Sequence, residues 1–188
     1  GAIQRDLTLP DLRSLPVGQA NILGRPLDAW WRALARDTAQ KVGDLVKGAR
    51  ATGMAPDELS RQVAAVLDRA QQHAKSLTTT AVQAIANQAR LEVARENQDQ
   101  IRGILWSAIL DARTTPICRA LNGRVFAPDR LPTYPAHFGE RSSLVPIGRG
   151  DVTPIVPSYD QWLQDQDNAT QDEALGPTRA RLWREGRI

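Results

Sequence analysis

Six prolines between residues 128 and 157 restrict the fold of this 188-residue chain more than any other feature of its sequence. Proline fixes its own φ angle, donates no backbone hydrogen bond and disfavours helix in the residue before it. No regular helix can pass through this stretch. It follows two strand candidates, residues 104–110 and 124–126, the second of which comes after an Asn-Gly turn signal at 122–123. We expect a small antiparallel sheet with long Pro-rich loops over residues 103–157. The prolines are Pro128, Pro132, Pro135, Pro146, Pro154 and Pro157.

Residues 26–102 follow a helical pattern. Apolar residues recur there at the i, i+3, i+4 spacing of an amphipathic helix until Gly53. Pro56, followed by two acidic residues, is a typical opening of a second helix. We expect the three threonines at 78–80 to separate this helix from a third, whose buried face carries small residues.

The two ends of the chain have different patterns. Residues 1–25 are interrupted by proline and glycine, which predicts an extended arm. Residues 158–188 are amphipathic and are broken at Gly176-Pro177, which predicts a tail of two short helices. The predicted fold class is therefore α+β, with a predominantly helical N-terminal part packed on a small antiparallel sheet and followed by a short helical tail.

Composition excludes several classes of protein. The chain has 41% hydrophobic and 24% charged residues, as soluble globular domains do, and we expect neither a membrane span nor a secretory signal. Its single cysteine cannot form an intramolecular disulfide. A net charge of +3 permits contact with phosphate groups without demonstrating it.

The middle of the chain gathers the residue types that most often carry chemistry. Cys118 and His137 could form a thiolate–imidazolium pair, and Asp111 could join them as a third metal ligand. The spacing of Ile117 and Leu121 around Cys118, however, favours a buried structural thiol. Three scattered ligands of mixed type are too few for a closed metal site. We therefore predict no catalytic residue, no metal ligand and no cofactor.

The neighbouring polar residues also have structural interpretations. Asp111 or Thr114 can cap the short helix that follows them, while Arg113 pairs with Asp111 or another carboxylate. His137 and Arg141 lie in a Pro-rich loop, where they could bind phosphate or nucleic acid, or could hydrogen-bond backbone carbonyls and hold the loop in place. The second interpretation is favoured.

Several motifs in a fixed order resemble the phage head-morphogenesis family typified by the Mu F-like minor head proteins. The resemblance extends from about residue 59 to the end of the chain. It rests on residues 87–90, 106–118, 122–126, 135–137 and 141–143, together with the tail segments 159–163 and 175–179. The family-motif residues, which we expect to have structural roles, are Trp106, Asp111, Arg113, Thr114, Cys118, Gly123, Pro135, His137 and Arg141.

The chain departs from the family pattern at one position. Many members carry a Cys just after the His, in an order that suggests a metal or disulfide staple with the earlier Cys. Here His137 is followed by Phe138, Gly139 and Glu140. We expect hydrogen bonds and packing to hold this loop instead.

The resemblance implies a minor capsid component, structural and not enzymatic, that acts in head assembly and in DNA packaging or delivery near the portal vertex. The implied partners are the portal protein, other capsid proteins and, non-specifically, DNA, without a membrane. The implied location is the virion head, and the host cytoplasm during assembly. Residues that could bind a partner are Trp30, Trp31, Trp162 and Trp183. For the pair Trp30 and Trp31, the helical spacing favours core anchors.

The alternative is a module of a phage-encoded effector or toxin such as an ADP-ribosyltransferase. Such an enzyme needs an acidic pair of the Glu-x-Glu type to orient the ribose and activate the nucleophile. No Glu-x-Glu occurs in this chain, which favours the structural role.

Overall fold

The computed structural model of the chain describes residues 8–9 and 20–188. These residues divide into two compact units. The first, which we call the helical unit, comprises the described residues 20–86 together with Thr133–Glu140. The second, the sheet unit, comprises residues 8–9, 87–132 and Arg141–Ile188.

The helical unit begins with a short hairpin. Strand β1 (Asn21–Ile22) pairs antiparallel with β2 (Arg25–Pro26). Gly24 in the turn between them has a φ of 81° and donates its N–H to the Asn21 side chain at 2.7 Å. Of the arm predicted over residues 1–25, positions 1–7 and 10–19 lie outside the described residues, and positions 21–25 turn back instead of running on as an extended segment.

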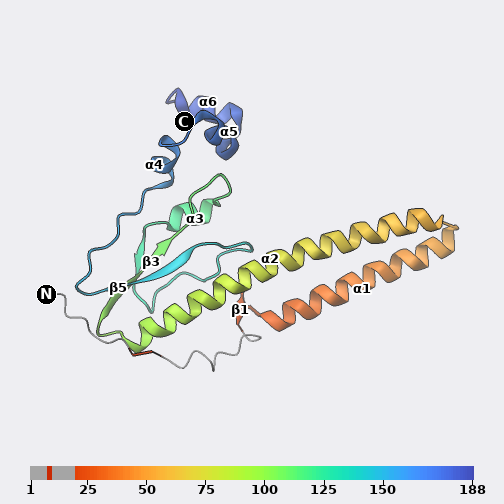
Figure 1. Cartoon of the computed structure of the whole chain (residues 1–188), viewed down its shortest axis with the longest axis horizontal. Coiled ribbons are helices and arrows are strands. Elements are labelled where there is room, and N and C mark those ends of the chain that lie inside the picture. The colour runs from red at the N-terminus through yellow and green to blue at the C-terminus, as the bar shows by residue number, and fades with distance from the viewer. Residues whose placement is uncertain (1–7, 10–19) are drawn as a thin grey trace. The chain divides into compact units, whose positions relative to one another are not determined.

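Two long helices follow the hairpin. Helix α1 (Leu27–Thr52) ends at Gly53, whose φ of 67° is the left-handed conformation that glycine adopts without strain. Helix α2 (Pro56–Glu96) then returns along α1, so that the first part of α2 and α1 form an antiparallel pair (Figure 1). The predicted end of the first helix at Gly53 and the predicted start of the second at Pro56 are confirmed.

The predicted break at residues 78–80 is wrong, because α2 continues through all three threonines. The hydroxyl groups of Thr78, Thr79 and Thr80 donate to the carbonyl four residues earlier, at 2.9, 3.0 and 2.7 Å. A threonine hydroxyl bonded in this way is satisfied without leaving the helix, so the run does not act as a terminus.

The core of the helical unit joins the hairpin to α2. Trp30 packs against this core and donates its Nε1–H to the Ile22 carbonyl at 2.8 Å, which ties the start of α1 to β1. Trp31, the next residue, is 37% exposed. Only the first tryptophan of the pair therefore serves as a core anchor. The buried members of the core are Ile22, Leu27, Leu77, Ala81 and Ala84.

The sheet unit contains three antiparallel strands in the order β4-β3-β5. They are β3 (Ile101–Ser107), β4 (Val125–Phe126) and β5 (Ser143–Gly148). The strand predicted over 104–110 begins and ends three residues earlier, because β5 pairs with β3 from Ile101 to Ser107 and a turn follows. Pro146, expected in an irregular segment, lies in β5. An edge strand tolerates a proline because its outer side needs no ladder hydrogen bond.

The tail contains three helices where two were predicted. They are α4 (Tyr159–Gln164), α5 (Asn168–Leu175) and α6 (Pro177–Arg184). The additional break lies before α5, where the Asp167 side chain accepts the Thr170 N–H at 2.8 Å and so caps a new helix. The predicted break at Gly176 is confirmed.

The α+β fold class is thus confirmed, with a long helical N-terminal part and small antiparallel sheets. In the part of the chain that the structure describes, we find no helix with the length and apolar character that a bilayer crossing requires.

Gly103 in β3 provides a test of the sheet packing. A Cβ at this position would lie 2.6 Å from the Val125 side chain and 3.1 Å from the Phe126 carbonyl oxygen. We expect G103A to lower the free energy of unfolding by about 1.5 kcal/mol, because β4 must move away from β3. G43A in α1, where a Cβ meets nothing within 4 Å, should instead be neutral or stabilising. Urea unfolding measures the free energy of unfolding of both variants. Equal changes in G103A and G43A would contradict the close packing of β4 on β3.

Candidate functional site

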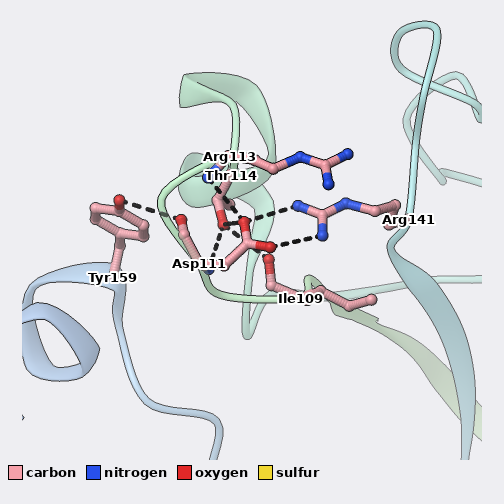
Figure 2. A network of polar contacts seen from close by, with 6 residues as sticks. All are labelled: Ile109, Asp111, Arg113, Thr114, Arg141 and Tyr159. Atoms are coloured by element: carbon pink, nitrogen blue, oxygen red, sulfur yellow. Dashed lines mark hydrogen bonds and ion pairs between the residues drawn. The ribbon is translucent and has the colours of Figure 1, made fainter. Parts of the chain in front are cut away.

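The turn after β3 is held by an ion pair between residues thirty positions apart. Arg141 donates from Nη1 to Asp111 Oδ2 at 2.6 Å and from Nη2 to Asp111 Oδ1 at 2.7 Å. Figure 2 shows the guanidinium group facing the carboxylate in this bidentate arrangement. The pair joins the turn to the segment that leads into β5.

Backbone hydrogen bonds complete the turn around Asp111. The Arg113 N–H donates to Asp111 Oδ1 at 2.9 Å. The hydroxyl of buried Thr114 accepts the Asp111 N–H and donates to the Ile109 carbonyl, both at 2.8 Å (Figure 2). The side chains of Asp111 and Thr114 are thus both hydrogen-bonded to backbone groups of the turn, as Asp and Thr side chains often are in compact turns.

The surroundings of Asp111 stabilise the ionised form of its carboxylate. The hydrogen bond from Arg141 lowers the pKa of Asp111 to about 2, and the N–H of Arg113 acts in the same direction, while burial opposes both. A carboxylate that is ionised at neutral pH and already bonded through both oxygens is a poor general base. The arrangement stabilises the turn.

The tail is attached to the same turn by Tyr159 at the start of α4. Its hydroxyl donates to the Asp111 carbonyl at 3.3 Å, and the Arg119 guanidinium lies 3.6 Å from the centre of its ring. Arg119 also donates from Nε to the Thr114 carbonyl at 2.9 Å. Burial raises the pKa of Tyr159. The phenol therefore stays protonated at neutral pH and continues to donate to Asp111.

Helix α3 (Pro116–Leu121) corrects two predictions. Its N-terminal cap is Thr115, whose hydroxyl accepts the Cys118 N–H at 3.4 Å, and neither Asp111 nor Thr114. Cys118 is buried as predicted, but Ile117 is 46% exposed, because a six-residue helix turns only one narrow side inward.

The turn after α3 ties the sheet to the loop that precedes the tail. The Asn122 side chain accepts the Ala108 N–H and donates to the Pro157 carbonyl, both at 2.9 Å. Gly123 has a φ of 77° and donates its N–H to the carbonyl of fully buried Trp106 at 2.9 Å. The predicted Asn-Gly turn is confirmed, and its glycine is required by the backbone conformation.

Asn87 is a buried amide that the sequence patterns did not single out, although motif 87–90 contains it. It donates from Nδ2 to the Ser142 carbonyl at 3.0 Å and accepts the Leu144 N–H at 2.9 Å, which connects α2 to β5. The signal in the sequence was its place on the apolar stripe of α2, three residues after Ala84 and seven before Ala94. A polar residue on such a stripe requires buried partners.

The loop Thr133–Glu140 belongs to the helical unit and carries the motif residues Pro135 and His137. His137 Nδ1 lies 2.7 Å from the Phe138 carbonyl, and its Nε2 lies 3.6 Å from the carboxylate of fully buried Glu140. The Gly139 N–H donates to Thr80 Oγ1 at 2.8 Å. Hydrogen bonds within the loop and to α2 thus contribute to holding it in place.

A comparison with protein families matches residues 40–142 to the family described as Phage Mu protein F like protein. The matched segment is more than half of the 188 residues. The chain belongs to this family. A Mu F-like protein is a phage head-morphogenesis protein of structural type. No curated protein and no solved structure matched the chain.

The Mu F-like match includes the whole Asp111–Arg141 pair and the loop that bears His137. Four of the motif residues make the following contacts within their own units. Asp111, Thr114 and Arg141 form the turn cluster of the sheet unit, whereas His137 contacts its own loop in the helical unit. The Arg113 side chain is exposed, and only its backbone N–H contributes to the cluster.

Thr80 and Thr79 provide a matched pair for testing the loop of this Mu F-like chain. Thr80 is fully buried and accepts the Gly139 N–H, whereas Thr79 is exposed. T80V keeps the shape of the side chain but removes the acceptor, so we expect a loss of about 1 kcal/mol in unfolding free energy and faster hydrogen exchange at the Gly139 amide. T79V should change neither quantity. Unchanged exchange at Gly139 in T80V would contradict this role of Thr80.

Proposed function

We propose that this chain is a minor head protein of a phage or prophage that acts in capsid assembly, and in DNA packaging or delivery, near the portal vertex. The family match over residues 40–142 carries the proposal. The proposed partners are the portal protein, other capsid proteins and, non-specifically, DNA. The protein would enter the virion head from the host cytoplasm during assembly.

We infer a structural and not a catalytic role from the state of the polar residues in the motifs. The Asp111 carboxylate is bonded to Arg141 through both oxygens, and Thr114 is bonded to the backbone of its own turn. Cys118 is buried. Polar side chains that are already bonded within the fold support a scaffold in which the turn after β3 and the tail are held together in the sheet unit.

Trp31 is the tryptophan that best suits contact with a partner. It is exposed on α1, whereas Trp30 packs on its own core and Trp162 packs against Tyr159 with ring centres 5.0 Å apart. Trp183 is half-buried on α6. Exposed aromatic side chains are enriched at protein interfaces, so we propose Trp31 as a contact residue.

Co-expression with the portal protein of the same phage tests this function. We expect the two proteins to co-elute in size-exclusion chromatography and the chain to be present in procapsids purified after expression of the head proteins. A portal protein from an unrelated phage serves as the control. Absence of the chain from both the portal complex and the procapsid would overturn the proposal.

A further inference from the structure

A pocket of about 310 Å³ in the sheet unit is lined by three arginines. Arg95 lies in the last turn of α2, Arg102 lies in β3, and Arg149 follows β5. The fold thus brings Arg149 to the same pocket as Arg102 and Arg95, which lie 47 and 54 positions earlier in the sequence. The lining is completed by Gln98, Ile101, Pro128 and Asp129.

Backbone carbonyls fix the direction of two of these side chains. Arg149 donates from Nε to the Asp99 carbonyl at 2.7 Å and from Nη2 to the Gln98 carbonyl at 3.3 Å. Arg102 donates from Nη2 to the Asp151 carbonyl at 3.3 Å and to the Thr153 hydroxyl. A guanidinium group has five N–H donors, so both retain donors for a ligand while already positioned.

The charges at this pocket do not cancel. Carbonyl groups orient Arg102 and Arg149 without neutralising them, and within the described residues neither arginine forms an ion pair. Arg95 pairs with Glu92 at 2.6 Å, and Asp129 is the carboxylate in the lining. The pocket therefore keeps an excess of positive charge in positions that suit an anion with several acceptor oxygens.

We propose that Arg95, Arg102 and Arg149 bind the phosphodiester backbone of double-stranded DNA. This inference deepens the proposed function and rests on it, because a head protein near packaged DNA is placed to meet this ligand. Duplex DNA presents one negative charge per roughly 1.7 Å of helix axis, so adjacent phosphates can engage more than one exposed guanidinium. The pocket offers no pattern for reading bases, and binding is therefore independent of sequence.

Fluorescence anisotropy with the full chain and a labelled duplex of about 20 base pairs, at salt concentrations from about 50 to 200 mM, tests the site. We expect R102Q/R149Q to weaken binding by about tenfold or more and to reduce the slope of log K against log salt by about two. The matched control is R36Q/R50Q, which removes the same charge from exposed positions on α1. This control should keep the salt slope of the parent chain.

Two further measurements distinguish DNA binding from a loss of folding and from the binding of free phosphates. R102K/R149K keeps both charges, so it should bind DNA more tightly than R102Q/R149Q, and thermal unfolding must show that both variants are folded. Equal losses in R102Q/R149Q and R36Q/R50Q, or no DNA binding by the parent chain, would overturn the inference. Saturable binding of tripolyphosphate without binding of the duplex would assign the pocket to free phosphates and would also overturn it. Association with the portal protein is measured in a separate experiment. The result of that experiment tests the proposed function and not the arginine pocket.

Discussion

Replacing Asn87 by leucine is expected to lower the free energy of unfolding by about 3 kcal/mol. The leucine leaves the Ser142 carbonyl and the Leu144 N–H without the amide that bonds them, at 3.0 and 2.9 Å, in a region where both residues are almost completely buried. Each buried polar group that loses its partner costs roughly 1–3 kcal/mol. The contact between α2 and β5 should weaken accordingly.

Urea denaturation followed by circular dichroism measures this effect. The control is Q72L, which makes the same kind of exchange at an exposed position of α2 and should change stability by less than about 0.5 kcal/mol. If N87L and Q72L have the same unfolding free energy, Asn87 does not connect the helix to the sheet as described.

The second large effect is expected for the Asp111–Arg141 pair. D111A removes both hydrogen bonds to the guanidinium and the acceptor of the Arg113 N–H. Hydrogen bonds to a charged group are worth about 1.5–3 kcal/mol each when buried. Because the Asp111 side chain is 36% exposed, solvent screens the pair, and we expect a total loss of about 2 kcal/mol.

The same residue makes stability depend on acid. Its pKa falls from an ordinary 3.8 to about 2 in the folded chain, chiefly through the hydrogen bond from Arg141. The unfolded chain therefore binds the proton first as pH falls, so the contribution of Asp111 is complete above about pH 4 and disappears on approach to pH 2. The difference in unfolding free energy between the parent chain and D111N should shrink over that window.

Glu58 supplies the control for this pH experiment. Hydrogen bonds from Gln62 and then Arg61 lower its pKa, but its side chain on the first turn of α2 is 41% exposed, so solvent screens these contacts. E58Q should therefore change the acid dependence of stability less than D111N does. A D111N curve parallel to that of the parent chain between pH 4 and pH 2 would contradict the role of the Arg141 pair.

Hydrogen bonds between distant residues give the motif order a structural reason. Arg141 reaches back to Asp111, Asn122 reaches forward to Pro157, and Tyr159 closes on the Asp111 carbonyl. Each contact joins residues at least thirty positions apart. Two of the three involve Asp111 in the turn after β3, and the third involves Asn122 in the turn after α3. A change in the spacing of any one motif would move its partner out of reach.

Local signals in the sequence determined much of this architecture. The α+β class, the end of α1 at Gly53, the start of α2 at Pro56 and the break at Gly176 were all predictable, because glycine and proline act on the backbone within a few residues. Family membership was also readable from the order of motifs, and the match over residues 40–142 supports it.

Only the tertiary structure decided the rest, since these features depend on residues far apart in the chain. Pairing with β5 fixed the ends of β3 and placed Pro146 on a sheet edge. Burial of the stripe that includes Asn87 gave that amide its partners, and no local pattern indicated that Arg141 would engage Asp111. Nearby residues determine which backbone turns can form. The pairing of distant polar groups depends instead on the free energy of burying them together with their hydrogen-bond partners.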